Sequence, residues 1–207
     1  MSSARRSWAA FAAVLLAATA ASQSPRNLGD DMTNAGGKLG PTASETSYAL
    51  CFGDGTGVPC PAGNFGALGR GCENSLRAGG ALLATHGEAS VSSDSFSLHV
   101  DGIPRRTSVL FLQGTKLSNG GAGRPFGDGL LCLGGSVLKL GVCRVDDGSC
   151  VFPPVTAQGC TASISMLGGI PARGGTRDYQ ALYRDNRPAG TRANFNLTNA
   201  WVQVWTP

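Results

Sequence analysis

Cysteine usage constrains the fold of this chain more than any other feature of its sequence. The seven cysteines are Cys51, Cys60, Cys72, Cys132, Cys143, Cys150 and Cys160. A structural zinc site needs cysteine pairs with only about two to four residues between them, and no two cysteines here lie that close. We therefore expect disulfide bonds with one cysteine left over, in a connectivity that the sequence leaves open. Cys143 and Cys150 flank the turn-forming residues 146–149, which suits a bond across a hairpin turn.

The amino-terminal segment has the parts of a secretory signal peptide. Two arginines precede an uncharged, apolar run from Trp8 to Ala21 that ends in small residues. A membrane-spanning helix needs about 20 apolar residues, and this run is shorter. We predict a signal peptide over residues 1–21, a flexible leader over 22–46 and a single domain over 47–207. Export would place the cysteines in an oxidising compartment, where disulfides persist.

No later hydrophobic run is long enough to cross a membrane, so we expect no transmembrane anchor and a secreted, extracytoplasmic or cell-surface location. The formal net charge is +4, and the basic residues are scattered along the chain. Binding to nucleic acid through charge needs a concentrated basic patch and a larger excess. We therefore expect no nucleic-acid partner.

The composition favours strands joined by tight turns. Charged residues make up 14% of the chain, glycines number 31, and runs of helix-forming residues are nearly absent after the leader. Disorder would also explain the glycines, but disordered chains lack hydrophobic residues, which make up 42% here. We predict an all-β fold.

Short apolar segments between glycine and aspartate turns indicate the strands of this fold. The expected strands are residues 96–100, 107–112, 130–133, 137–142, 163–167, 179–183 and 200–205. The pair Gly134–Gly135 separates two of them and predicts a hairpin turn. Many short strands of this kind favour a two-sheet, jelly-roll-like sandwich. We expect it to follow an irregular region rich in cysteine and glycine.

Four polar residues could form a metal site. His86, Glu88, His99 and Asp101 offer nitrogen and oxygen ligands, provided that neighbouring strands bring them together. Such a site would make the protein a secreted metal-dependent hydrolase. The alternative is that all four are solvent-facing residues of strand edges and turns, since nothing in the sequence links His86 to the others.

Three aspartates, Asp54, Asp128 and Asp147, each precede a glycine. Asp-Gly is first of all a turn-forming pair. None of the three loops has the alternating acidic residues of a dedicated calcium loop, although the sequence leaves room for a structural calcium ion.

Aromatic residues near the carboxyl end allow a carbohydrate-binding face. Trp201 and Trp205 share one face of the last expected strand, and Tyr179 and Tyr183 share one face of another, followed by Arg184. Burial in the core is the favoured interpretation, because large aromatic side chains contribute most when they are buried. For nucleophilic catalysis, the chain lacks the Gly-x-Ser-x-Gly motif, and we predict no catalytic residue.

Several segments together resemble an uncharacterised family of exported bacterial proteins that is abundant in planctomycetes and myxobacteria. The matching segments are residues 51–57 (CFGDGTG), 60–64 (CPAGN), 71–75 (GCENS), 110–114 (LFLQG), 126–132 (FGDGLLC), 179–185 (YQALYRD) and 195–201 (FNLTNAW). The resemblance implies a secreted or surface β-sandwich and assigns no biochemical activity. Two departures from the family pattern are Ala62, where the family has a cysteine, and Leu182, where it often has tryptophan. Asn196 begins a glycosylation sequon, which we interpret as part of the strand motif.

The sequence thus favours an exported, non-catalytic binding or structural module. Its ligand stays open, and a cell-surface glycan or a protein is the expected kind of partner. The competing hypotheses are the secreted metal-dependent hydrolase and the carbohydrate-binding domain.

Overall fold

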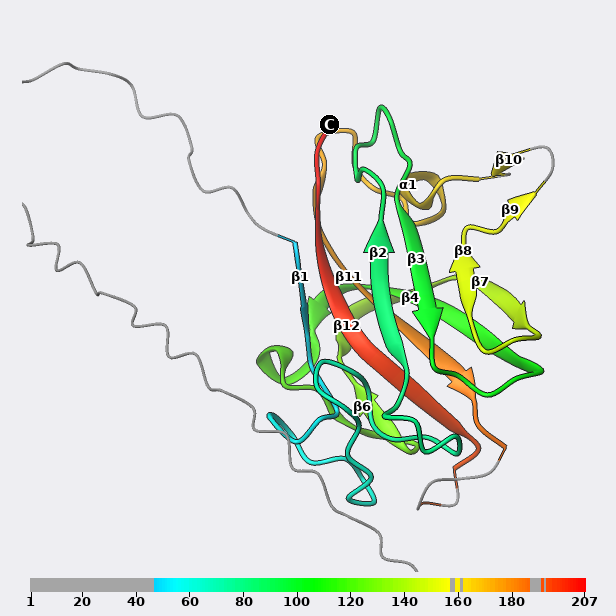
Figure 1. Cartoon of the computed structure of the whole chain (residues 1–207). Helices are drawn as coiled ribbons and strands as arrows, with labels where there is room; N and C mark the ends of the chain where they lie inside the picture. Colours follow the sequence, from blue (N-terminus) through cyan, green and yellow to red (C-terminus); the bar gives the residue numbers. More distant parts are fainter. Residues whose placement is uncertain (1–46, 157–158, 161, 187–190, 192) are drawn as a thin grey trace, which may run out of the picture. The chain divides into compact units, whose positions relative to one another are not determined.

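The regular elements of the described part are almost all antiparallel strands (Figure 1). The computed structural model describes residues 47–156, 159–160, 162–186, 191 and 193–207. The predicted signal peptide and flexible leader lie outside these residues.

Two sheets form the body of the domain. The larger sheet has the strand order β1-β12-β11-β4-β7 and the smaller one β2-β3-β8. The strands of the larger sheet are β1 (Tyr48–Leu50), β4 (Thr107–Leu117), β7 (Leu133–Val145), β11 (Gly175–Arg184) and β12 (Phe195–Trp205). Those of the smaller sheet are β2 (Leu82–His86), β3 (Ser97–Asp101) and β8 (Cys150–Phe152). The remaining elements are β5 (Arg124–Phe126), β6 (Gly129–Leu131), β9 (Val155–Thr156), β10 (Gly159–Cys160), the short 3₁₀ helix η1 (Ser118–Gly121) and the helix α1 (Ile164–Leu167).

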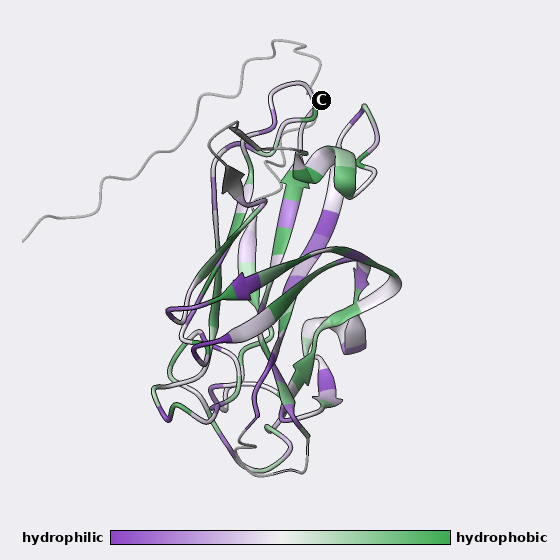
Figure 2. Cartoon of the chain, turned by 90° about the vertical axis from the view of Figure 1, so that its right-hand side faces the viewer, coloured by the Kyte–Doolittle hydropathy of each residue, from purple (hydrophilic) through white to green (hydrophobic). Residues whose placement is uncertain are grey.

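The main hydrophobic core lies between the two sheets. Leu98 and Val100 of β3 are buried in it, whereas their neighbour His99 points to the other face of its sheet. Tyr179 and Tyr183 of β11 enter the same core from the larger sheet. Hydrophobic and hydrophilic residues therefore alternate along the strands, as the pleat requires (Figure 2). The predicted all-β two-sheet sandwich is confirmed.

A second, smaller core covers the opposite face of the larger sheet. It contains Leu130, Ala200 and three buried cysteines, Cys60, Cys72 and Cys132. Because both faces of β12 are covered, residues 196–200 are all buried rather than alternating. The irregular cysteine- and glycine-rich region is thus packed against the sandwich.

Three disulfide bonds hold this arrangement. Cys51–Cys132 spans 81 residues of sequence, Cys60–Cys72 spans 12, and Cys143–Cys150 spans 7. The predicted bond between Cys143 and Cys150 is confirmed. The three bonds use six of the seven cysteines. The seventh is Cys160, whose side chain lies outside the described part.

Two of the expected elements are wrong. Gly134 and Gly135 lie inside the continuous strand β7, where Gly135 has a φ of 64° and the register with β4 shifts. The positive φ therefore serves a β-bulge and not a hairpin turn, and glycine suits both. Residues 164–167 form α1 and not a strand, because Ser163 caps the helix, its hydroxyl accepting a hydrogen bond from the Met166 amide.

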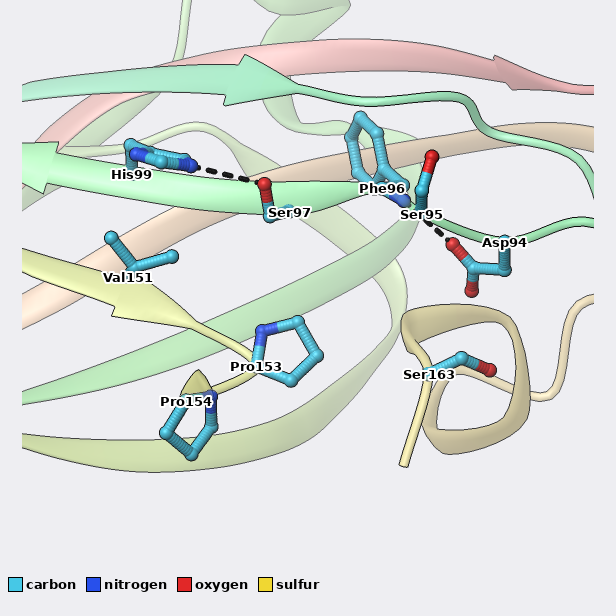
Figure 3. Close-up of a pocket in the computed structure, with 9 residues that line it drawn as sticks. All are labelled: Asp94, Ser95, Phe96, Ser97, His99, Val151, Pro153, Pro154 and Ser163. Carbon is cyan, nitrogen blue, oxygen red and sulfur yellow. Dashed lines mark hydrogen bonds between the residues drawn. The ribbon is translucent and has the colours of Figure 1, made fainter. Parts of the chain in front are cut away.

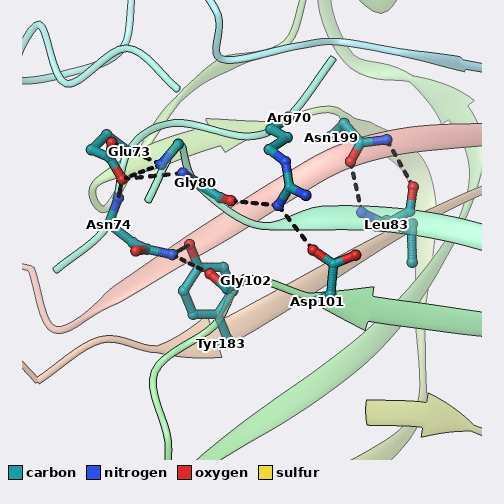
Figure 4. A network of polar contacts seen from close by, with 10 residues as sticks. Arg70, Glu73, Asn74, Gly80, Leu83, Asp101, Gly102, Tyr183 and Asn199 are labelled. Carbon is teal, nitrogen blue, oxygen red and sulfur yellow. Dashed lines mark hydrogen bonds and ion pairs between the residues drawn. The ribbon is translucent and has the colours of Figure 1, made fainter. Parts of the chain in front are cut away.

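Buried amide side chains tie the sheets and the irregular region together (Figure 4). Asn199 of β12 accepts a hydrogen bond from the Leu83 amide (2.8 Å) and donates one to the Leu83 carbonyl (3.1 Å), so it pairs with the free edge of β2. Asn74 donates to the Gly102 carbonyl and to the Tyr183 hydroxyl. These bonds satisfy backbone groups that would otherwise be buried without partners.

Asp178 of β11 makes the stability of the domain pH-dependent. Burial raises the pKa of its carboxyl group from 3.8 to about 6, and the nearby Arg177 guanidinium opposes this only in part. The folded protein therefore binds more protons than the unfolded chain between about pH 4 and 6. The contribution of Asp178 to stability is present below about pH 4 and is lost as the pH rises through 6.

Replacing Asp178 with asparagine should remove this pH dependence. Urea unfolding at pH 4 and pH 8 is expected to show a wild-type loss of about 2 to 3 kcal/mol that is absent in Asp178→Asn. Gln203→Ala is the control, because Gln203 lies on the neighbouring strand β12 and has no titrating group. It should change the free energy of unfolding by the same amount at pH 4 and at pH 8. Identical pH profiles for wild type and Asp178→Asn would contradict the assignment.

Candidate functional site

The two predicted histidine ligands do come together. His86 at the end of β2 and His99 in β3 have ring centroids 4.3 Å apart and tilted by 59°. The register places His99 opposite Ala84 and His86 opposite Ser97, so both imidazoles lie on the outer face of the smaller sheet. Burial and the neighbouring His86 lower the pKa of His99.

The two predicted carboxylate ligands do not join them. Asp101 accepts a 2.9 Å ion-paired hydrogen bond from Arg70, which also donates to the Gly80 carbonyl (Figure 4). Glu88 is exposed, and its backbone amide donates to Ser95. Among the described residues, no group of three or more histidine, cysteine, aspartate or glutamate side chains could hold a metal ion. The four-residue site that the hydrolase hypothesis requires is therefore not assembled there.

The aromatic residues proposed for sugar binding are mostly in the core. Tyr179, Tyr183 and Trp205 are buried. The Trp205 indole donates to the Tyr179 hydroxyl (2.9 Å), which donates to Gln113 (3.1 Å). Trp201 is half-buried and packs against the same core. Three of the four rings are thus unavailable for stacking on a ligand, whereas Arg184 at the end of β11 is exposed.

The three Asp-Gly aspartates hold loops. Asp54 accepts from the Thr56 and Gly69 amides, and Asp147 accepts from the Ser149 amide across its turn. Asp128 is fully buried and accepts from the amide and hydroxyl of Thr191. Asn196 is also buried, and its side chain donates to the Glu73 carbonyl, as expected for a strand motif rather than a glycosylation site.

A pocket of about 640 Å³ opens between the smaller sheet and α1 (Figure 3). We call it the β3–β8 pocket. It is lined by Asp94, Ser95, Phe96, Ser97, His99, Val151, Pro153, Pro154 and Ser163. Sequence analysis missed it, because its residues come from three separate segments and only His99 carried a chemical signal. Its volume lies within the range of about 300–1,000 Å³ that is typical of small-molecule sites.

Asp94 shapes the wall of this pocket. One of its carboxylate oxygens accepts from the Phe96 amide (2.9 Å) and the other accepts from the Ser165 amide (2.7 Å). The carboxylate thus fastens the loop before β3 to the first turn of α1. Gln113 donates to the Gly168 carbonyl and holds the other end of α1 on the larger sheet. These hydrogen bonds connect two of the segments that surround the pocket.

The pocket offers two kinds of contact. Phe96, Val151 and the two prolines supply an apolar surface, whereas serine hydroxyls and the His99 imidazole supply hydrogen-bonding groups (Figure 3). Ser97 and His99 are within hydrogen-bonding distance of each other, with 3.0 Å between Oγ and Nε2. An apolar surface with a few polar groups is the usual composition of a small-molecule site.

Comparison with known proteins assigns no family, since the chain matches no protein-family model, no curated protein and no solved structure. The resemblance to exported bacterial proteins therefore stays a prediction. Within the described residues, no helix is both long and apolar enough to cross a membrane.

Proposed function

We propose that this protein is an exported, non-catalytic binding module that holds a small, partly apolar ligand in the β3–β8 pocket. The observation that carries the proposal is the pocket itself, with its volume of about 640 Å³ and its lining of apolar side chains with a few polar groups. The hydrogen bonds of Asp94 to two separate segments hold part of its wall in place before a ligand binds, which lowers the entropic cost of binding.

Export is supported by the leader sequence and by the three disulfides. Bonds between cysteines persist outside the cytoplasm and are rare within it. The loop closed by Cys51–Cys132 contains most of the irregular region, the strands β2 and β3 of the smaller sheet and the strand β4 of the larger one, so reduction would affect both sheets. A module of this kind suits an extracytoplasmic location.

Binding is favoured over catalysis by the way in which the polar residues are used. Both oxygens of Asp94, the one carboxylate that lines the pocket, already accept backbone amides. In the described part, neither oxygen bonds to His99, so the Ser97–His99 contact lacks the third group that orients a catalytic histidine.

Partly filling the pocket should weaken ligand binding. Benzyl alcohol and benzylamine are suitable probes, because each combines an apolar ring with one polar group. We expect them to shift the amide NMR signals of Phe96, Ser97 and Val151 in the disulfide-bonded protein. Val151→Trp, which places an indole at the pocket wall, should weaken binding by at least about tenfold, or about 1.4 kcal/mol.

Val137→Trp is the matched control, because Val137 is a similarly exposed valine on β7 that does not line the pocket. It should leave probe binding unchanged. The proposal fails if neither probe perturbs the three amides, or if the Val151→Trp protein binds the probes as the wild type does.

A further inference from the structure

The only two histidines of the chain meet on the outer face of the smaller sheet. They lie 13 positions apart in the sequence, and the β2–β3 pairing brings their ring centroids to 4.3 Å. His86 is exposed and His99 is partly buried. Main-chain hydrogen bonds on both strands fix the positions from which the two rings project.

The spacing of the rings is close to that of two imidazoles on one metal ion. A metal–nitrogen distance of about 2.0–2.1 Å, with the two nitrogens roughly 90–110° apart, places the ring centroids about 4.5–5 Å apart. The observed centroid separation of 4.3 Å is close to this range.

We propose that His86 and His99 together bind a late divalent transition-metal ion at the rim of the β3–β8 pocket. Imidazole nitrogen is a good ligand for copper, nickel and zinc, and affinity for a given site rises toward copper. The two rings occupy two coordination positions, and the others are open to water or to a ligand of the pocket. Copper(II) is therefore the ion that the site binds most tightly.

The surroundings of the two rings support this assignment. The nearest carboxylate on the same face of β3 belongs to Asp101, and it is ion-paired with Arg70. The Asp101 carboxylate therefore does not hold either imidazole in a hydrogen bond that a metal ion would have to displace. Ser97 contacts Nε2 of His99, which leaves the other ring nitrogen of His99 for the metal ion. A hydroxyl that binds one ring nitrogen in this way orients the imidazole whose other nitrogen binds a metal ion.

Copper(II) titration of the untagged, disulfide-bonded protein tests the proposal. The protein should carry Cys160→Ser, so that a thiol does not bind the metal. Isothermal titration calorimetry should give one site, and electron spin-echo spectroscopy should show two coordinated imidazoles. His86→Asn and His99→Asn should each weaken binding by at least about tenfold and reduce the spectroscopic count to one imidazole.

Ser92→Ala, an exposed neighbour on the loop between β2 and β3, is the matched control and should bind copper as the parent protein does. His86→Asn changes an exposed side chain, so its fold is expected to stay intact even if His99→Asn is destabilised. Equal affinity in the parent and in His86→Asn, or a single imidazole in the parent, would overturn the proposal. The titration uses metal alone, so its outcome is independent of probe binding in the pocket.

Discussion

Replacing Cys51 and Cys132 together with alanine is expected to destabilise the folded domain by about 4 to 5 kcal/mol, the largest effect that we anticipate. This bond closes a loop of 81 residues, so its loss frees the most conformational entropy in the unfolded chain. It also links the segment after β1 to the junction of β6 and β7, where Cys132 is fully buried in the second core. Urea unfolding of the variant and the wild type measures the difference.

The two other disulfides provide the controls. Loops of 12 and 7 residues predict losses of about 2.8 kcal/mol for the Cys60–Cys72 pair and about 2.4 kcal/mol for the Cys143–Cys150 pair. The expected loss of stability therefore increases with the length of the loop that the missing bond closed. A Cys51→Ala/Cys132→Ala variant that is as stable as either short-loop variant would show that this bond does not constrain the unfolded chain as proposed.

The second large effect is expected at Gln180, a fully buried side chain of β11. Its carbonyl oxygen accepts from the Cys132 amide (2.9 Å), and its amide nitrogen donates to the carbonyls of Leu130 and Thr198, both at 2.8 Å. One side chain thus joins β11, β12 and the β6–β7 junction. Gln180→Leu keeps a similar volume but leaves these three backbone groups buried without partners.

We expect Gln180→Leu to lower the free energy of unfolding by about 3 to 5 kcal/mol, since each unsatisfied buried group costs about 1 to 3 kcal/mol. Gln203→Leu is the control. Gln203 is half-buried and accepts one side-chain bond, from the Trp201 indole, so its loss should cost less than about 1 kcal/mol. Similar costs for the two variants in urea unfolding would show that the Gln180 bonds contribute little.

The two mutated sites should also be coupled. Gln180 contacts both the amide and the sulfur of Cys132. Groups in direct contact give non-additive effects, so the combined variant should lose less than the sum of the separate losses.

The class of fold was predictable from the sequence because the core follows local alternation. The segment around Leu98 shows its buried face directly in the order of residues. The segment around Tyr179 does so less clearly, because Asp178 to Ala181 are all buried. The bond between Cys143 and Cys150 was also predictable, because a turn lies between them. Pairing of Cys51 with Cys132 was not, because it depends on contacts between segments 81 residues apart.

The two wrong predictions of secondary structure have physical causes as well. Glycine permits a positive φ in a turn and in a bulge, so Gly134–Gly135 did not distinguish a hairpin from the interior of β7. The Ser163 cap signal of α1 was concealed by an apolar run that fits a strand equally well.

Of the candidate site, the sequence indicated only fragments. The sequence left open whether His86, Glu88, His99 and Asp101 form one site or are separate solvent-facing residues. The two imidazoles do meet, whereas Asp101 is ion-paired with Arg70, which no local pattern reveals. The β3–β8 pocket was not predictable, since it forms only when the loop before β3, the segment after β8 and α1 meet. Its construction depends on hydrogen bonds from Asp94 to backbone amides of two separate segments.

The central inference is that this chain is a disulfide-bonded domain that functions outside the cytoplasm. Mass spectrometry of the protein recovered from the exterior of its producing cells, with peptide mapping under non-reducing conditions, tests this directly. The result expected is a chain lacking residues 1–21 that contains Cys51–Cys132, Cys60–Cys72 and Cys143–Cys150 bonds. A full-length protein confined to the cytosol, with all seven cysteines reduced, would contradict it.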